Sequence, residues 1–384
     1  MRVLHVGKYY PPYQGGMENF LRDLLKALKG EGISVFGLVH HHIPARPFSR
    51  EEDDGVPIIR VRSSGQLLYL PVSPSFPRLL RYAIRRFRPD ILHLHFPNPS
   101  ACWSLLIPEA RSLPWIIQWQ SDVVPSTIDR RLKAAYQIYR PLEQAVLRRT
   151  QRVIVASEPY LEYSEPLKRW TSKCRVIPLG IDPARLAWPD APLLKEAERS
   201  WSPGMLKVLA VGRFTYYKGF DVLIQSAARV PGVAVQIVGD GALRDTLQSQ
   251  ISKSGVTGRI RLRGGLPDRE LQALMATCDL LSLQSIERTE AFGIVLLEAM
   301  RYGKALVVSD IPGSGAGWVV RKGSCGFLTV PGDPVSLADL FERLVSHPGL
   351  CEWVGMRGKE RLEEVFHIRS VARQIIDVYR ELGV

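Results

Sequence analysis

Two positively charged side chains, Arg213 and Lys218, lie on one short loop between an apolar run and a helical pattern. Arginine offers a fork of N–H donors and lysine a compact charge, so a pair at this spacing can straddle a diphosphate. Two exposed basic side chains on a surface turn would give the same pattern. The pair alone therefore leaves both interpretations open.

Two carboxylates, Glu290 and Glu298, flank the expected start of a helix at about Gly293. The free N–H groups of a helix N-terminus favour an anion, and carboxylate oxygens accept hydrogen bonds from sugar hydroxyls. A single acid near a helix start is usually only a partner of the helix dipole. An acid on each side of the start favours a binding site for a polar ligand.

A third feature, Gly15–Gly16, lies between a first strand and a helix that opens at about Met17. Two glycines permit left-handed backbone and let a ligand approach the main chain at a helix N-terminus. A bound phosphate and a plain strand-to-helix turn would both explain this pattern.

The segments that carry these residues alternate between short apolar runs and longer helical patterns. In the first half we expect strands at 3–6, 34–39, 58–61, 91–95, 115–119 and 152–156, and helices at 20–28, 77–87 and 132–148. The pattern then restarts, with strands at 207–211, 234–238, 260–264, 280–283, 305–308 and 326–330, and helices at 220–228, 241–254, 268–277, 294–301 and 334–346. Such alternation predicts parallel strands joined by crossover helices.

A proline-rich, weakly periodic stretch at 182–204 predicts a linker between two doubly wound α/β units. Ligands of such sheets bind at the carboxyl ends of the strands, so two units facing each other would enclose a cleft. A last helix, at about 368–382, could belong to either unit.

The composition is that of an ordinary globular protein with a length suited to two domains: 384 residues, 46% hydrophobic and 23% charged. It excludes a disordered chain, a collagen and a small disulfide-stapled scaffold. The start lacks the apolar run of a signal peptide, and no stretch approaches the ~18 apolar residues of a membrane span. We therefore expect a soluble protein, peripheral to a membrane at most. Five scattered cysteines argue against a zinc site and fit a reducing compartment.

The net charge of +13 is unevenly distributed. Residues 1–180 hold 26 Lys and Arg against 15 Asp and Glu, whereas residues 181–384 hold 25 against 23. The basic residues of the first half are densest at Arg78, Arg81, Arg85, Arg86 and Arg88, and at Arg130, Arg131, Lys133, Arg140, Arg148, Arg149 and Arg152. This asymmetry indicates an anionic partner (nucleic acid, a phosphate-bearing ligand or an acidic membrane face), although a solvated surface would also accommodate each cluster.

A nucleic-acid-binding protein is the alternative from another functional class. It should interleave aromatic residues with a basic stripe or carry a recognised module. Tyr82 and Phe87 lie among the arginines, but their helical spacing suits a packed face. The sequence therefore disfavours a nucleic-acid partner.

Taken together, the motifs resemble the GT4 family of retaining glycosyltransferases, over essentially the whole chain. The resemblance rests on Gly15–Gly16–Met17–Glu18, Val211–Gly212–Arg213 with Lys218–Gly219, Val238–Gly239–Asp240–Gly241, and two glutamates spaced as Glu290 and Glu298. It implies the GT-B fold, in which two Rossmann-like domains face each other across a cleft. Residues 1–175 would form the acceptor-binding domain and 176–367 the donor-binding domain, and the helix in 368–384 could pack back on the first.

The resemblance also implies roles for individual residues. Arg213 and Lys218 would neutralise the donor diphosphate, Glu290 would hold the transferred sugar, and Glu298 would accept from the ribose. The remaining donor contacts would come from Gly15, Gly16, Gly212, Asp240, Gly241, Phe292, Gly293 and Ile294. His95 would lie near the acceptor, and its neighbour His93 is more simply a packed strand histidine.

One position departs from the family pattern. The run Gln118–Trp119–Gln120–Ser121–Asp122 aligns with a family segment that usually has histidine where this chain has Gln120, beside the transferred sugar. Glutamine can donate and accept hydrogen bonds but cannot carry a charge. Gln120 and Asp122 are therefore expected in the catalytic site, with Gln120 replacing only the hydrogen bonds of the histidine.

The resemblance further implies a reaction and a location. The expected donor is GDP-mannose and the alternative is a UDP-sugar; the expected acceptor is a glycan on a lipid or polyprenyl-diphosphate carrier. No metal or other cofactor is expected. A relative with epimerase or hydrolase activity is a further alternative, which the basic first half disfavours. The enzyme would work in the cytoplasm, peripherally at the inner face of an anionic membrane.

Overall fold

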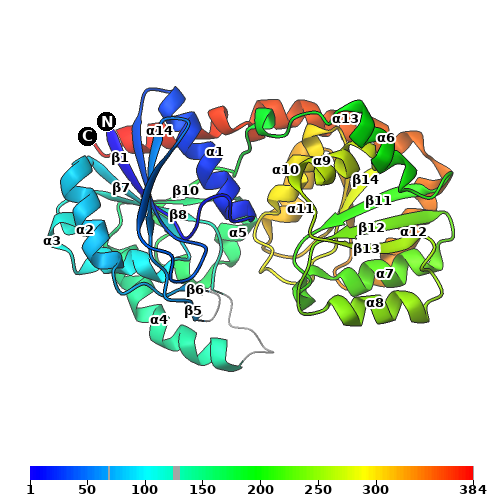
Figure 1. The fold of residues 1–384 in the computed structure, drawn as a ribbon, viewed down its shortest axis with the longest axis horizontal. Helices are drawn as coiled ribbons and strands as arrows, with labels where there is room; N and C mark the ends of the chain where they lie inside the picture. Colours follow the sequence, from blue (N-terminus) through cyan, green and yellow to red (C-terminus); the bar gives the residue numbers. More distant parts are fainter. Residues whose placement is uncertain (68–69, 124–129, 384) are drawn as a thin grey trace. The chain divides into compact units, whose positions relative to one another are not determined.

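The structure is a computed structural model that describes residues 1–67, 70–123 and 130–383, and it divides into two compact units (Figure 1). Unit 1 comprises Met1–Ile181 and Ile368–Val384, and unit 2 comprises Asp182–His367. The C-terminal helix thus belongs to unit 1. The boundary between the units lies at 181/182, a few residues after the expected boundary at 175/176. Side chains of Arg130, Arg131 and Lys133, three of the predicted basic cluster, lie outside the described part.

Unit 1 contains an eight-stranded sheet in the order β10-β9-β8-β7-β1-β2-β4-β3. Its strands are β1 (Arg2–Val6), β2 (Ser34–His40), β3 (Ser49–Asp53), β4 (Val56–Val61), β7 (Ile91–Phe96), β8 (Trp115–Trp119), β9 (Arg152–Val155) and β10 (Cys174–Val176). All neighbours pair in parallel except β3, which forms an antiparallel hairpin edge with β4. The hairpin was not expected, because Ser49–Asp53 is almost entirely polar and has no strand-like apolar alternation. Residues 66–67 and 70–71 form a separate small ladder, β5–β6.

The helices of unit 1 cover this sheet (Figure 1). They are α1 (Gly16–Gly30), α2 (Phe76–Phe87), α3 (Pro108–Arg111), α4 (Arg130–Arg149), α5 (Glu158–Tyr163) and α14 (Ile368–Arg380). α14 packs along α1, which explains why the end of the chain returns to unit 1. The central strands β1 and β7 are buried along nearly their whole length, as expected for parallel strands covered on both faces.

Unit 2 contains a six-stranded, wholly parallel sheet in the order β13-β12-β11-β14-β15-β16. Its strands are β11 (Leu206–Val211), β12 (Val233–Val238), β13 (Ile260–Gly264), β14 (Leu280–Leu283), β15 (Ala305–Ser309) and β16 (Gly326–Thr329). Its helices are α6 (Ala191–Arg199), α7 (Phe220–Arg229), α8 (Arg244–Lys253), α9 (Asp268–Thr277), α10 (Ile294–Arg301), α11 (Gly315–Gly323), α12 (Pro334–Ser346) and α13 (Gly349–Arg361). The predicted doubly wound α/β class is therefore confirmed for both units.

The expectation of a plain linker at 182–204 is wrong. Within it, Ala191–Arg199 forms α6, which packs against α9. The side chain of Asp190 accepts from the backbone N–H of Leu193 at 3.1 Å, and Pro192 lies in the first turn. Pro192 is compatible with this helix, because a proline in the first turn removes no intrahelical hydrogen bond.

Candidate functional site

The two residues that the sequence assigned to separate tasks, Lys218 and Glu290, form one ion pair in unit 2. Nζ of Lys218 lies 2.5 Å from Oε2 of Glu290, and both side chains are mostly buried. The Ser285 hydroxyl also donates to Oε2 of Glu290, at 3.2 Å. Burial opposes the lysine charge, but attraction to Glu290 outweighs it and raises the pKa of Lys218. Lys218 is therefore a buried cation held in place before any ligand arrives.

The loop after β11 holds Lys218 through its backbone. Tyr216–Lys218 form one 3₁₀ turn, and Gly219 closes it in the left-handed region at φ 61° before α7 begins. A Cβ atom on Gly219 would lie 1.9 Å from the carbonyl oxygen of Gln284, at the end of β14. The N–H of Ile286 also donates to the carbonyl of Tyr217 at 2.8 Å. The loops that carry Lys218 and Glu290 are thus in direct contact through their main-chain atoms.

Arg213 lies on the same loop and Asp240 on the loop after β12, and both side chains are less firmly held than that of Lys218. Arg213 is exposed, and its charge is close enough to Lys218 to oppose the lysine's protonation. The loop after β12 meets the loop after β11 where Phe214 donates to the carbonyl of Asp240 at 2.9 Å. The Asp240 side chain is exposed and pairs loosely with Arg244 at 3.5 Å. Both residues stand at the carboxyl ends of parallel strands, where the sequence placed them.

Two helix N-termini meet at the Glu290 loop. Gly293 is the N-cap of α10 at φ 78°, and Phe292 and Ile294 beside it are buried. Ser314, the N-cap of α11, donates its hydroxyl to the carbonyl of Glu290 at 2.5 Å. The start of α11 is therefore tied to the Glu290 loop, a contact that the sequence pattern did not reveal.

Glu298 on α10 already has a partner that the sequence did not predict. The Arg185 guanidinium lies 3.3 Å from its carboxylate, and each side chain is only 17% exposed. Around it, Arg301 donates to the carbonyl of Pro183 and the Tyr302 hydroxyl to that of Ala187. The segment at the start of unit 2 is thus fastened to α10. No sequence signal links Arg185 to Glu298, because 113 residues separate them.

In unit 1 the glycine pair opens α1, but the helix start is covered by the chain's own carboxylate. Glu18 is buried, and a Cβ atom on Gly15 would lie 2.2 Å from its Oε2. Glycine at the N-cap followed three residues later by glutamate resembles a capping box, a signal that the sequence interpretation passed over. Gly15 therefore makes room for the Glu18 carboxylate at the start of α1.

Glu18 also lines a small pocket in unit 1 together with Lys8, His95 and Gln120. The structure thus brings His95 and Gln120 to one pocket. Among the described residues, Nδ1 of His95 and Nε2 of Gln120 are buried without a hydrogen-bond partner. Such groups are suited to a hydroxyl-bearing ligand.

Asp122 lies close by in the chain but is used structurally. Its Oδ1 accepts from Nε1 of Trp119 at 2.8 Å and from the Ser164 hydroxyl at 2.7 Å. A buried glutamate of α4, Glu143, lies near enough to feel its charge. Burial, assisted by Asp122, raises the pKa of Glu143 to about 7. The sequence missed Glu143, which stands in a helical pattern with no distinguishing neighbours.

Comparison with known proteins gives matches over most of the chain. Residues 15–180 match the family model described as glycosyl transferase 4-like domain, and residues 196–361 match the one described as glycosyl transferases group 1. O-antigen chain mannosyltransferase C of Escherichia coli is 28% identical over 390 residues, covering 100% of this chain and 98% of the relative. D-rhamnosyltransferase WbpZ of Pseudomonas aeruginosa is also 28% identical, covering 95% and 92%.

Among solved structures, sucrose-phosphate synthase from Thermosynechococcus elongatus superposes with a TM-score of 0.81 at 23% identity. The match covers 100% of this chain and 99% of that one. At this identity the likeness shows the fold alone, and it confirms the predicted two-domain architecture.

Proposed function

Because the chain belongs to the glycosyltransferases that combine a 4-like domain with a group 1 domain, we propose that it transfers mannose from GDP-mannose. The acceptor in this proposal is a lipid-linked or oligosaccharide glycan in the assembly of surface polysaccharide. The O-antigen mannosyltransferase and the rhamnosyltransferase among its relatives support both parts. A UDP-sugar donor is the alternative.

The observation that carries the proposal is the buried Lys218–Glu290 pair beside the N-termini of α10 and α11. A donor diphosphate placed there would meet Lys218, Arg213 and the first N–H groups of α10, so its charge would be neutralised without a metal. Glu290 would exchange part of its contact with Lys218 for hydroxyls of the sugar. Glu298, oriented by Arg185, would accept from the ribose hydroxyls.

We propose transfer with retention of configuration. The bond between the sugar and the diphosphate breaks, leaving an oxocarbenium-like sugar, and the acceptor hydroxyl attacks from the same face. The departing phosphate oxygen takes the proton of that hydroxyl, so no carboxylate nucleophile is needed. Lys218 would stabilise the negative charge that develops on the leaving diphosphate. The pocket of His95 and Gln120 in unit 1 would contact sugar hydroxyls.

The donor is tested by a thermal-shift and hydrolysis screen over GDP-mannose, GDP, UDP-glucose and UDP. We expect GDP-mannose to give the largest rise in Tm and slow release of GDP. A response to UDP-sugars alone would contradict GDP-mannose as the donor and favour a UDP-sugar. No response to any nucleotide sugar would contradict the proposed glycosyl transfer.

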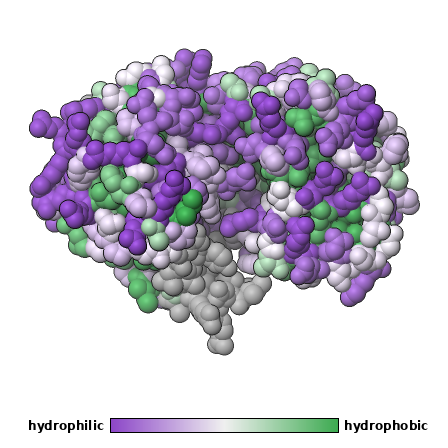
Figure 2. Space-filling view, in the orientation of Figure 1, coloured by the Kyte–Doolittle hydropathy of each residue, from purple (hydrophilic) through white to green (hydrophobic). Residues whose placement is uncertain are grey.

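We further propose that unit 1 docks on an anionic membrane face in the cytoplasm. No described helix is long and apolar enough to span a membrane. Figure 2 shows a mostly hydrophilic surface with separate hydrophobic areas. On unit 1, α4 exposes Ile138 and Leu142, and the adjoining 3₁₀ segment (Pro99–Leu105) and its end expose Trp103 and Leu106. Apolar side chains of this kind beside arginines suit a lipid surface.

Not all the arginines of the predicted docking face are available. Arg81 and Arg85 both pair with Glu109. Arg149 donates to the carbonyls of Arg111 and Leu113, and Arg152 pairs with Glu381. Arg78, Arg86 and Arg88 are exposed and stand at or near α2. Fewer unpaired arginines are therefore available for docking than the number of basic residues in the sequence suggested.

Replacing Arg78, Arg86 and Arg88 by glutamine should weaken binding to vesicles that contain phosphatidylglycerol. Each basic residue near such a surface contributes about 1 kcal/mol, so we expect a loss of more than roughly tenfold. A matched variant with three exposed arginines of unit 2 changed, Arg229→Gln, Arg269→Gln and Arg343→Gln, should bind as the wild type does. Cosedimentation measures both, with the GDP-mannose Tm shift unchanged in each. Equal binding by the two variants would reject docking through α2.

A further inference from the structure

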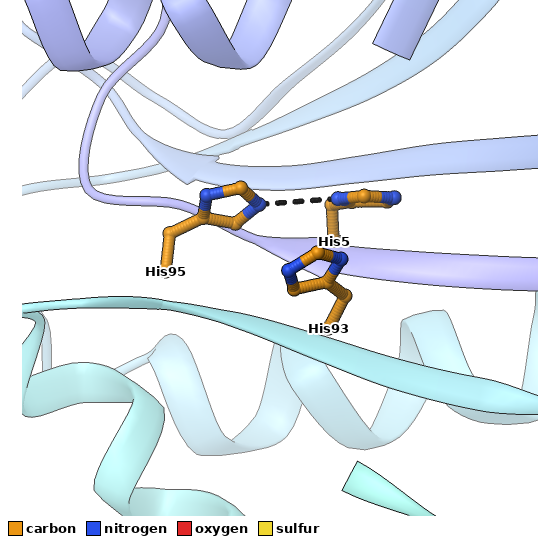
Figure 3. Close-up of side chains that lie close together, drawn as sticks. All are labelled: His5, His93 and His95. Carbon is orange, nitrogen blue, oxygen red and sulfur yellow. Dashed lines mark hydrogen bonds between the residues drawn. The ribbon is translucent and has the colours of Figure 1, made fainter. Parts of the chain in front are cut away.

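Three histidines meet inside unit 1 (Figure 3), and one of them, His95, also lines the small pocket described above. His5 lies on β1, and His93 and His95 lie on the neighbouring strand β7. His5 stands directly opposite His93 in the parallel register, and His95 follows two residues later on the same face. All three side chains are at least 97% buried. Residues that look unrelated in the sequence therefore form one cluster.

The imidazole nitrogens lie close enough to share a ligand. Nδ1 of His5 is 3.1 Å from Nε2 of His95, and one nitrogen of each ring lies within 4.8 Å of the others. Within the described ranges this is the one group of three His, Cys, Asp or Glu side chains with such spacing. Figure 3 shows the three rings gathered around a common centre.

This arrangement leaves hydrogen-bonding capacity unused. Nε2 of His5, Nε2 of His93 and Nδ1 of His95 are buried and have no partner among the described residues. Burying a polar nitrogen without a partner costs free energy, so Nε2 of His93 is open to a ligand between the rings, whereas the unpaired atoms of His5 and His95 are the second nitrogens of rings that already face each other through Nδ1 and Nε2.

The surroundings supply an outer contact for one of the three histidines. Nδ1 of His93 lies 2.6 Å from the Tyr379 hydroxyl of α14, which fixes that ring. Gln118 stands opposite His95 on β8, is fully buried, and has neither amide atom bonded within the described part. A hydroxyl or amide that orients the second nitrogen of a ligand histidine is the usual support of such sites.

We propose that His5, His93 and His95 bind one divalent transition-metal ion, zinc in preference. Three neutral imidazoles are a known ligand set for zinc, with a water in the fourth position. Tetrahedral zinc with bonds of about 2.0–2.1 Å separates its nitrogens by about 3.3 Å, so the His5–His95 spacing is already suitable. Ring rotation of His93 has to supply the remaining approach.

The bound ion would join β1 to β7 and, through His93 and Tyr379, to α14. Since α14 packs on α1, the metal would fasten the C-terminal helix to the centre of the unit 1 sheet. This role is separate from the proposed metal-free transfer chemistry of unit 2. It also gives His93 a function beyond packing, and it departs from the expectation that no metal is bound.

The test measures metal in the whole protein, without donor or acceptor. The chain is stripped with a chelator, incubated with Zn²⁺, passed through a desalting column and analysed by mass spectrometry of the elements. We expect about one zinc per chain, a rise in Tm of roughly 5 °C or more, and visible absorption typical of tetrahedral cobalt after loading with Co²⁺. His93→Gln, which retains a partner for Tyr379, should abolish all three, and the exposed His347→Gln should change none.

Wild-type protein that retains less than about a tenth of an equivalent of zinc would overturn the proposal, since water would then satisfy the cluster. Equal zinc in the wild type and His93→Gln would also overturn it, because the metal would lie elsewhere. If His93→Gln fails to fold, His95→Asn takes its place, and the wild-type measurement stands by itself.

Discussion

Replacing Lys218 with alanine should lower kcat by more than about tenfold, because the lost charge acts mainly on the leaving diphosphate in the transition state. Lys218 is buried against Glu290, so no solvent screens its charge and no other cation can take over its position. Arg213 is exposed and more loosely placed. KM for the donor should change less than kcat, and a steady-state assay with saturating GDP-mannose measures both.

Two variants separate this effect from a loss of structure. Removing the lysine leaves the Glu290 carboxylate buried without its partner, which alone can unfold a loop. Glu290→Gln removes that charge while retaining a hydrogen-bond acceptor, so the double variant Lys218→Ala with Glu290→Gln should recover Tm but not turnover. Lys207→Ala, a change on β11, breaks a surface ion pair with Glu198 of α6 and should leave kcat unchanged. Near-normal turnover of Lys218→Ala would reject its assignment to the leaving group.

Local motifs predicted the fold and the positions of the main polar residues, because both depend on short-range patterns. The strand ahead of Arg213 and the helix behind Gly293 follow from apolar periodicity and glycine at the turn. The proximity of Glu18 to Gly15 could also have been predicted, since the spacing of the two residues is local. These features are encoded within a few neighbouring residues.

Contacts between residues far apart in the chain could not be predicted from the sequence. Arg185 meets Glu298 from 113 residues away, and Arg152 meets Glu381 from 229. Each depends on how helices and loops settle on the sheets, which no periodicity specifies. The same limit explains the overestimated basic face, because a count of arginines cannot tell which of them are neutralised at Glu109 or held by carbonyls. The same limit applies to His93, because its position opposite His5 depends on the register of β7 against β1.

The second large effect concerns the backbone that holds Lys218. Gly219→Ala should destabilise unit 2 by more than about 3 kcal/mol and lower Tm by roughly 6–12 °C. The added Cβ would lie 1.9 Å from the carbonyl oxygen of Gln284, a main-chain atom of β14's end that cannot swing aside. Differential scanning calorimetry measures the loss, and the thermal-shift response to GDP-mannose should disappear with it.

The left-handed backbone of Gly219 alone does not account for the large loss of stability expected for Gly219→Ala. Gly255 has a similar φ of 66°, but a Cβ there meets nothing within 4 Å. Gly255→Ala should therefore cost only the conformational penalty, about 1–2 kcal/mol. The difference between the two variants isolates the close approach of the Lys218 loop to the loop that carries Glu290. If both variants lost the same stability, the two loops would not be in contact, and Lys218 and Glu290 would have no fixed distance on which a shared site could depend.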